Sequence, residues 1–302
     1  IREEILNINL ENINLQSNSG PNSFANKLVK YKPKYITFDN NREYEATLCF
    51  VESHNLLPLK PLFLRMDGIY INTAQNYSAQ NANIKRTYQM SSGIIFQSEF
   101  GKKLIEKTFG VHENSIIIPN GADLLSISDT QPLAFNKYEN LWCCAANWRP
   151  HKRLSENIRY FLEHAGDNDG LIVAGAVPLS NQVKHTRIHY SGDLNQKQLF
   201  SLYKRSKFFI HLASLDCCPN VVIDARACDC KIVCTDSGGS REIAGSNAVV
   251  VKDLDWDYEP LDLYNPIKLD FSETIDNSLF GNSDYDMSSV SRKYFDFIKD
   301  GV

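Results

Sequence analysis

The sequence lacks the features that mark fibrous, disordered and membrane-spanning proteins. Glycine and proline are scarce, at 15 and 11 of 302 residues, and only 23% of residues are charged, which excludes a collagen-like or intrinsically disordered chain. The longest apolar runs, 141–146 and 208–213, are far shorter than the ~20 residues that a membrane-spanning helix needs. Because 43% of the residues are hydrophobic, we expect a globular protein of about two domains.

The sequence also has no excess of positive charge. Subtracting 36 acidic from 32 basic residues gives a net charge of −4, which provides no overall attraction to nucleic acid or anionic lipid. We therefore expect no nucleic-acid partner, and any phosphate must bind at a local group of cations. One basic patch in a predicted helix would suit a peripheral membrane contact, an anionic acceptor or simple solvation: Lys102, Lys103 and Lys107.

The cysteines lack the spacing of a zinc site. Five of the eight fall between 217 and 234, but neither Cys217 with Cys218 nor Cys228 with Cys230 has the two to four intervening residues of typical ligand pairs. We therefore predict buried thiols and no metal. The first residues, Arg2 to Glu4 followed by strand-like residues, do not resemble a signal peptide, so we expect a cytoplasmic location, with attachment at the periphery of a membrane left open.

Short apolar runs alternate with amphipathic stretches, which is typical of parallel strands linked by helices. The pattern predicts an α/β protein with two doubly wound domains. Predicted strands of the first part are 5–10, 35–38, 47–51, 62–66, 93–97 and 115–118. Predicted strands of the second part are 140–146, 170–174, 187–190, 208–212, 231–235 and 248–251, and predicted helices include 195–205, 219–227 and 288–299.

The alternation also sets the predicted domain boundaries. After Asn120-Gly121 the sequence loses its clear period, so a linker is predicted there. Ligands bind outside the carboxyl ends of parallel strands, so we expect two domains that face each other across a cleft and a site within it. The predicted parts are a first domain, 1–123, a linker, 124–138, a second domain, 139–265, and a tail with an amphipathic helix, 266–302.

The segment 214–225 combines residues that suit an anion site. It follows a predicted buried strand, and Pro219 is suited to the first position of a helix. Asp216 before this helix and Asp224 inside it would bracket a ligand through its hydroxyl groups, although a helix cap and a solvated charge are equally open on spacing alone. Three backbone amides at the helix N-terminus would face a phosphate: Asn220, Val221 and Val222.

The same residues carry a resemblance to a known family. The Asp216-x7-Asp224 spacing, followed by Thr235-Asp236-Ser237-Gly238-Gly239 and Glu242, resembles the nucleotide-sugar signature of retaining glycosyltransferases of family 4, which have the GT-B fold. The resemblance covers about residues 5–252, and its six motifs come in the family's order. The other five segments that look like family motifs are 17–22, 94–100, 117–123, 148–153 and 191–194.

The resemblance implies a role for each site residue. Asp216 would hold sugar hydroxyls of the donor and Asp224 its ribose, while two cations, Arg149 and Lys152, would neutralise the departing diphosphate. Asp67, where the family often has a histidine, would orient or deprotonate the acceptor hydroxyl; a turn residue before Gly68 is the alternative. The remaining implied donor contacts are Gly20, Asn120, Asn220, Val221 and Val222.

Three departures from the family's pattern concern the donor. Both signature glutamates are aspartates, Pro219 stands where glycine is common, and Arg149 precedes Lys152 by three positions rather than five. Each aspartate is shorter in reach by about 1.5 Å, so the donor must bind differently. The segment 191–194 is similar to the loop that lines the nucleobase.

The resemblance therefore implies a retaining enzyme that moves a hexosyl or related sugar from a UDP- or GDP-sugar to a hydroxyl of a glycan or lipid-linked glycan. It implies no cofactor or metal, because cations and a helix N-terminus supply the positive field. A nucleotide-sugar epimerase or hydrolase of the same fold and a noncatalytic sugar-nucleotide binding module are the alternatives. A dinucleotide oxidoreductase is less favoured, because no strand is followed by G-x-G-x-x-G.

Overall fold

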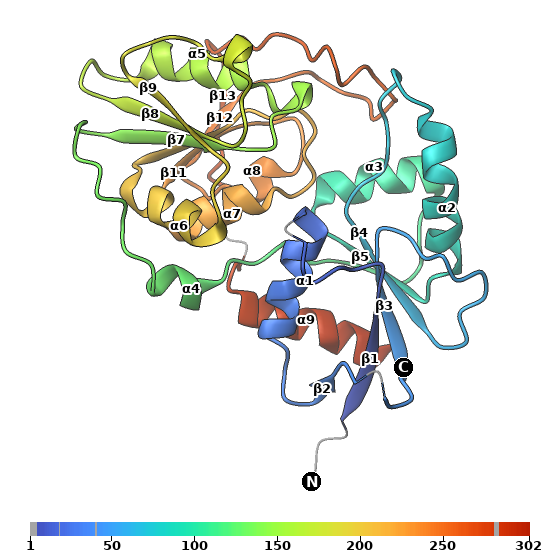
Figure 1. Ribbon diagram of the computed structural model, residues 1–302. Helices are drawn as coiled ribbons and strands as arrows, with labels where there is room; N and C mark the ends of the chain where they lie inside the picture. The colour runs from blue at the N-terminus through green and yellow to red at the C-terminus, as the bar shows by residue number, and fades with distance from the viewer. Residues whose placement is uncertain (1–4, 18, 40, 281–283) are drawn as a thin grey trace. The chain divides into compact units, whose positions relative to one another are not determined.

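The computed structural model describes residues 5–17, 19–39, 41–280 and 284–302, and it divides into two compact units (Figure 1). Arg2 to Glu4, which bear on the signal-peptide prediction, and Asn18 of the motif at 17–22 lie outside the described residues. Unit 1 contains Ile1–Gly121, Tyr258–Leu261 and Asp284–Val302, and unit 2 contains Ala122–Asp257 and Asp262–Ser283.

Unit 1 is built on a parallel six-stranded sheet in the order β2-β1-β3-β4-β5-β6. Each of these strands overlaps a predicted one, because each is a short apolar run. In a parallel sheet all carboxyl ends meet at one edge, so the residues that follow β4, β5 and β6 gather there. The strands are β1 (Leu6–Glu11), β2 (Ile36–Thr37), β3 (Ala46–Phe50), β4 (Leu62–Met66), β5 (Gly93–Phe96) and β6 (Ser115–Ile117).

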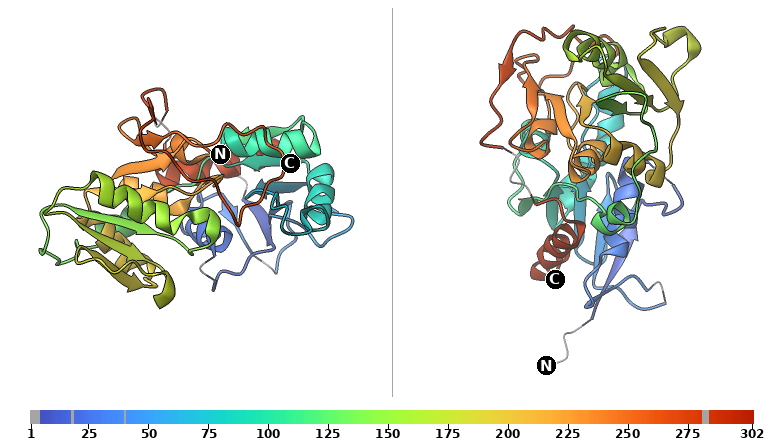
Figure 2. Two further views of the ribbon diagram at one scale, coloured as in Figure 1. Left: turned by 90° about the horizontal axis from the view of Figure 1, so that it is seen from above. Right: turned by 90° about the vertical axis from the view of Figure 1, so that its left-hand side faces the viewer.

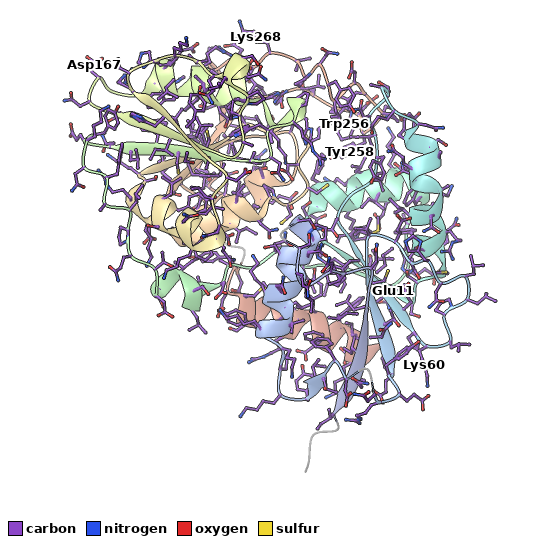
Figure 3. The ribbon with its side chains drawn as sticks, viewed as in Figure 1. Glu11, Lys60, Asp167, Trp256, Tyr258 and Lys268 are labelled. Atoms are coloured by element: carbon purple, nitrogen blue, oxygen red, sulfur yellow. The ribbon has the colours of Figure 1, made fainter. Side chains whose placement is uncertain are left out.

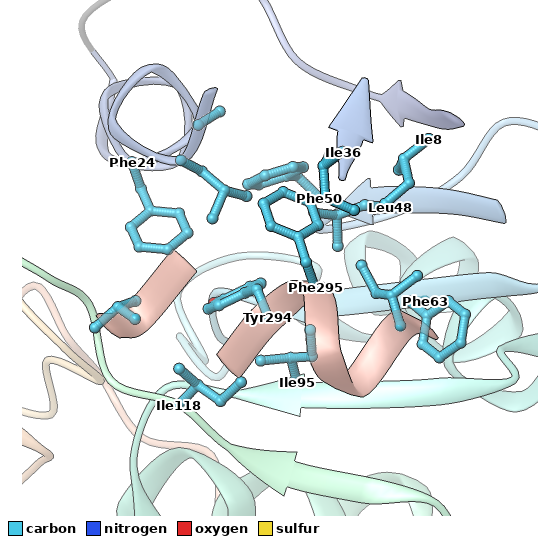
Figure 4. Close-up of a cluster of buried hydrophobic side chains, with 14 of the residues drawn as sticks. Ile8, Phe24, Ile36, Leu48, Phe50, Phe63, Ile95, Ile118, Tyr294 and Phe295 are labelled. Carbon is cyan, nitrogen blue, oxygen red and sulfur yellow. The ribbon is translucent and has the colours of Figure 1, made fainter. Parts of the chain in front are cut away.

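Helices cover both faces of this sheet. On one face α1 (Gly20–Lys30) and α9 (Met287–Asp300) bury Phe24, Tyr294 and Phe295 against the strands (Figure 4). On the other face α2 (Tyr77–Met90) and α3 (Glu99–Phe109) complete a second apolar cluster. The right-hand view of Figure 2 shows α9, in red, beside the blue N-terminal elements.

The last helix belongs to unit 1 by its contacts. Its apolar stripe, which includes Val290, Tyr294 and Ile298, is fully buried in the unit 1 core. Gly121 allows the close approach, because a Cβ atom there would lie 2.9 Å from the Cα atom of Met287. The sequence predicted this helix as the end of a separate tail; its packing places it in unit 1 instead, because its buried face has its partners there.

Unit 2 is built on a seven-stranded sheet in the order β13-β12-β11-β10-β7-β8-β9. β13 pairs antiparallel with β12, and the other neighbours pair in parallel. Six of the strands overlap predicted ones; β13 has two residues and lies in the predicted tail, where no strand was expected. The strands are β7 (Leu141–Ala145), β8 (Gly170–Ala174), β9 (Ile188–Gly192), β10 (Phe208–His211), β11 (Lys231–Thr235), β12 (Val249–Val251) and β13 (Thr274–Ile275).

The helices of unit 2 begin with side-chain caps where the sequence provides them. In the predicted linker, α4 starts after Asp123, whose carboxylate accepts a hydrogen bond from the amide of Ser126 at 3.0 Å. Asn195 and Gln198 cap α6 reciprocally at 2.9 Å. The helical elements are α4 (Leu124–Ser128), η1 (Pro150–Lys152), α5 (Leu154–His164), η2 (Leu179–Asn181), α6 (Gln196–Arg205), α7 (Asn220–Ala227) and α8 (Ser240–Ile243).

Across the described part of the chain, no helix combines the length and the apolar character that crossing a bilayer requires.

The basic patch predicted on α3 is partly neutralised within unit 1. Lys102 lies 3.9 Å from Glu106, and Lys107 lies 2.7 Å from Glu259. Next to Glu259, Tyr258 (Figure 3) packs on the ring of Phe100 of α3. A cytoplasmic location and a peripheral membrane contact stay predictions.

Candidate active site

Asp216 follows β10 and is fixed by the turn that follows β11. Its carbonyl oxygen accepts a hydrogen bond from the amide of Gly239 at 2.8 Å, and Leu215 donates to the carbonyl of Ser237 at 3.3 Å. Gly238 has a φ of +113°, and a Cβ atom there would lie 2.7 Å from the carbonyl oxygen of Asp216. Only glycine therefore fits beside Asp216 without moving its backbone.

We expect Gly238→Ala to lower the free energy of unfolding by about 1–3 kcal/mol, because alanine is strained at this φ and meets the Asp216 backbone. Urea unfolding followed by circular dichroism measures the change. Gly166→Ala is the matched control, because the nearest atoms to a Cβ at Gly166 lie 3.8 Å away. Equal losses in the two variants would show that the close approach at Gly238 is unimportant.

The carboxylate of Asp216 lies between two basic side chains. Its Oδ2 atom forms an ion pair with the ammonium of Lys152, in the segment after β7, and lies 3.3 Å from Nε2 of His211. The side chains of Lys152 and Asp216 are 21% and 17% exposed, whereas that of His211 is 4% exposed. The structure thus brings together two predicted site residues and adds His211, whose polar side chain in the apolar run 208–213 was the overlooked signal.

The charges of this cluster follow from burial and pairing. Burial alone would raise the pKa of Asp216, but the charge of Lys152 and the hydrogen bond with His211 hold that pKa well below its usual range. Burial lowers the pKa of His211, against the opposing effect of Asp216. Burial and then the charge of Lys152 lower the pKa of His151 to about 4. At neutral pH both imidazoles are therefore uncharged, and Lys152 supplies the positive charge.

A buried ion pair anchors the segment that carries Lys152. Arg153 has a φ of +51°, and its guanidinium nitrogens lie 2.6 and 3.0 Å from the carboxylate of Asp253, which follows β12. The hydroxyl of Ser237 donates to the same carboxylate, and the amide of Asp253 donates to Asp236 at 2.6 Å. The segments after β7, β11 and β12 are thereby joined at one edge of the sheet. Sequence reasoning missed this network.

Arg149 lies at the start of η1 and is exposed. It forms no ion pair with any residue that the structure describes. The neighbouring Trp148 is fixed, because its indole donates to the carbonyl of Ala174 at 2.9 Å and lies against Gly175. The guanidinium of Arg149 is therefore accessible to an anion in solution, next to the segment that carries Lys152.

The N-terminus of α7 differs in detail from the prediction. The helix begins at Asn220, one residue later than predicted, with Pro219 before it. The amide of Val222 donates to the carbonyl of Pro219 at 3.1 Å, so it is not an open donor. Phosphate contacts of Asn220 and Val221 stay predictions.

Asp224 has a different environment from Asp216. Burial, and next the charge of Asp224, raise the pKa of Cys228 to about 12. The same carboxylate contributes to the raised pKa of Tyr203, where burial is the main cause. The backbone agrees, because the amide of Cys228 donates to the carbonyl of Asp224 at 3.2 Å, whereas Asp216 pairs with Lys152 and His211. A ribose contact of Asp224 stays a prediction.

The predicted residues of unit 1 gather at the carboxyl ends of its strands. Asp67 after β4 forms an ion pair with Arg65 through Oδ1, which also accepts a hydrogen bond from Gln97 at 2.8 Å. Asn120 accepts a hydrogen bond from Arg65 at 2.8 Å and is buried. Gly20 is the exposed first residue of α1. Donor contacts of Asn120 and Gly20 stay predictions.

Unit 2 also contains a cavity of about 540 Å³ beside the predicted nucleobase loop. Ser191 and Leu194 of that loop line it, together with Leu133 and the first turns of α6. Its walls are mainly apolar, and they include neither Lys152 nor Asp216. Among the described residues, no three His, Cys, Asp or Glu side chains are placed to hold a metal ion.

Comparison with known proteins identifies the fold. Residues 128–258, most of unit 2, match the family model described as glycosyl transferases group 1. Anabaena Alr3699/HepE, solved in complex with UDP, is similar with a TM-score of 0.67 at 11% identity, over 98% of this chain and 100% of that chain. A glycosyltransferase from Rickettsia africae ESF-5 is similar with a TM-score of 0.63 at 13% identity, over 98% of each chain. The fold is GT-B. No curated protein matches the chain significantly.

The GT-B fold also extends to larger enzymes. Sucrose-phosphate synthase from Thermosynechococcus elongatus is similar with a TM-score of 0.63 at 12% identity, over 85% of this chain and 73% of that chain. The α/β class and the Rossmann-like form of the two units, predicted from the sequence, are confirmed. The GT-B fold and the match of residues 128–258 to the group 1 family model together support a glycosyltransferase.

Proposed function

We propose that this protein is a retaining glycosyltransferase that moves a sugar from a nucleoside-diphosphate sugar to an acceptor hydroxyl. The observation that carries the proposal is the cluster of Lys152, Asp216 and His211 beyond the carboxyl ends of two adjacent parallel strands, β7 and β10. This is the edge of an open α/β sheet where ligands bind. Residues 128–258, most of unit 2, match a glycosyltransferase family model, and on this basis we assign sugar transfer to the cluster.

The proposed mechanism uses the positive charge where negative charge develops. The acceptor oxygen forms a bond to the anomeric carbon of the sugar as the bond between the sugar and the diphosphate breaks, and the hydroxyl proton passes to the departing phosphate. Negative charge accumulates on that phosphate, and Lys152 and Arg149 stabilise it. A phosphate oxygen that binds Lys152 competes with Asp216 for the ammonium. The carboxylate of Asp216 then accepts hydrogen bonds from sugar hydroxyls. Because two side-chain cations supply the field, we propose that no metal is needed.

We propose a UDP- or GDP-sugar as the donor and a glycan or lipid-linked glycan as the acceptor. Support for UDP comes from Alr3699/HepE, which was solved in complex with UDP-glucose. Asp67 is proposed to bind the acceptor hydroxyl in unit 1. A retaining enzyme gives a product whose anomeric configuration equals that of the donor. Proton NMR of the new glycoside measures this configuration. Donor consumption at a full rate without acceptor would indicate a hydrolase or an epimerase instead.

We expect a nucleotide sugar to stabilise the wild-type protein and to bind at least about tenfold more weakly to Asp216→Ala and to Asp224→Ala, because each variant loses charge-assisted hydrogen bonds. Thermal-shift titrations with UDP-, GDP-, ADP- and CMP-sugars measure both effects. At a ligand concentration of 100 times Kd, the wild type gains about 2.7 kcal/mol.

Asp167→Ala is the control for these titrations. Asp167 (Figure 3) is an exposed aspartate just before β8, at the amino end of that strand. Its removal should leave the affinity for the nucleotide sugar unchanged. Wild-type affinity in both Asp216→Ala and Asp224→Ala would contradict the proposed donor site, and a wild-type protein that binds no nucleotide sugar would contradict the function.

A further inference from the structure

A fully buried arginine lies behind the proposed acceptor carboxylate in unit 1. Arg65 of β4 is 1% exposed, and its guanidinium carbon lies 4.2 Å from the ring centroid of Phe24. The guanidinium donates to three groups on different elements: Asp67, Asn120 Oδ1 at 2.8 Å and the hydroxyl of Tyr294 at 3.2 Å. A buried charge with several fixed partners has a defined position, and so do the groups that it holds.

The carboxylate of Asp67 still has unused hydrogen-bonding capacity. Oδ1 accepts from both Arg65 and Gln97, whereas Oδ2 is buried and accepts no hydrogen bond from the described residues. A carboxylate oxygen without a donor is costly, and such groups call for a functional explanation. The Asp67 side chain as a whole is 19% exposed, against 1% for Arg65, so Asp67 is the member of the ion pair that lies nearer to the surface of unit 1.

Strand geometry accounts for the pairing. Arg65 and Asp67 are two residues apart at the end of β4, so their side chains point to the same face of the sheet. That face is the one covered by α9, which brings Tyr294 to the guanidinium. Gln97 and Asn120 follow β5 and β6 at the same edge of the parallel sheet.

We infer that Arg65 is a positioning residue for the acceptor: it orients the Asp67 carboxylate toward a hydroxyl of the carbohydrate acceptor, and Tyr294 of the last helix completes this arrangement. The inference rests on the proposed function, because it names the group that holds the acceptor. Arg65 itself touches no substrate. It holds the Asp67 carboxylate in place through the ion pair. Burial opposes the charged form of Arg65, but the charge of Asp67 outweighs this and raises the pKa of Arg65.

A purely structural ion pair predicts a different outcome from a positioning role. If Arg65 only stabilised the fold, its loss would lower stability without a selective effect on the acceptor. If Arg65 acts through Asp67, its loss lowers kcat/KM for the acceptor and leaves the affinity for the donor unchanged. In a protein that already carries an altered Asp67, the loss of Arg65 then lowers kcat/KM no further. A double-mutant cycle separates these two roles.

The cycle uses Arg65→Met, Asp67→Asn and the double variant. Turnover is followed as nucleotide release, with the nucleotide sugar that gives the largest wild-type thermal shift and with p-nitrophenyl glycosides as acceptors. We expect each single variant to lower kcat/KM for the best glycoside at least tenfold, with unchanged donor affinity. The double variant should be no slower than Asp67→Asn. Effects that multiply, or single variants with wild-type acceptor kinetics, would overturn the inference.

Two conservative variants test the inference if Arg65→Met does not fold. Arg65→Lys keeps the charge but reaches fewer partners than the guanidinium, so it should fall between Arg65→Met and the wild type. Tyr294→Phe removes one hydroxyl and should lower kcat/KM for the glycoside a few-fold. Its matched control is Tyr88→Phe, because the hydroxyl of Tyr88 is also engaged in unit 1, donating to the carbonyl of Gly110 at 2.8 Å.

The outcomes distinguish this inference from the proposed function. If Arg65→Met does not fold, a wild-type kcat/KM in both Arg65→Lys and Tyr294→Phe overturns the inference. Equal losses in Tyr294→Phe and Tyr88→Phe also count against it. A wild-type protein that binds a nucleotide sugar and transfers it, with unaffected variants, leaves the proposed function in place. A wild-type protein that binds no nucleotide sugar and releases no nucleotide with any glycoside overturns both.

Discussion

Replacement of Lys152 by methionine is expected to lower kcat about 100-fold, because it removes a charge placed where the departing diphosphate becomes more negative. Lys152 lies within ion-pair contact of Asp216, so the ammonium is held at the proposed site before any ligand binds. Methionine keeps most of the length and the apolar stem of the side chain. Steady-state kinetics with the best donor and acceptor of the panel measure the effect.

The expected loss of kcat in Lys152→Met depends on the positive charge at position 152. Lys152→Arg restores a cation and should recover part of the rate, although its planar group fits a different geometry. Lys60→Met is the matched control, because Lys60 (Figure 3) forms a surface ion pair with Glu43 at 2.7 Å in unit 1 and should leave kcat unchanged. A wild-type rate in Lys152→Met would remove this residue from the mechanism.

All strands except β13 were predictable, because each contains a short apolar or alternating run. The positions of the residues that follow these strands are set by the sheet. Thus Lys152 and Asp216 could be placed at one edge from the sequence order alone. α2 could not be predicted in the same way, because its buried residues are few and include Asn81 and Thr87, which interrupt an apolar stripe.

Partners of buried polar groups were harder to predict than the site residues themselves. His211 pairs with Asp216 only because the chain turns back after β10, through a residue with positive φ, Leu215. Arg65 and Asp67 are an exception: the two-residue spacing of opposite charges at the end of an apolar strand was visible in the sequence. The spacing alone did not predict that the pair is buried, because a single charge inside a strand is more commonly at the surface than in the core.

Loss of the ion pair between Arg153 and Asp253 is expected to produce the largest change in stability, a decrease of about 3–5 kcal/mol in the free energy of unfolding for either Arg153→Met or Asp253→Asn. The two side chains are only 2% and 0% exposed, so each single variant leaves a buried charge without its partner. The surface pair of Arg159 and Glu163, 3.2 Å apart at i,i+4, is the control. Glu163→Gln should cost far less, because the Glu163 side chain is 46% exposed and exposed helix pairs contribute about 0.3–0.5 kcal/mol.

The double variant Arg153→Met/Asp253→Asn tests the physical reason. If most of the loss comes from the stranded charge, removing both charges should be less destabilising than the sum of the two single changes. Urea unfolding gives the three free energies. The same variants should also lower kcat, because the segment that places Lys152 is tied to Asp253 through its neighbour in the chain. Additive losses of stability would show instead that each side chain contributes through packing alone, and the position of Lys152 would then have to be fixed by other contacts of that segment.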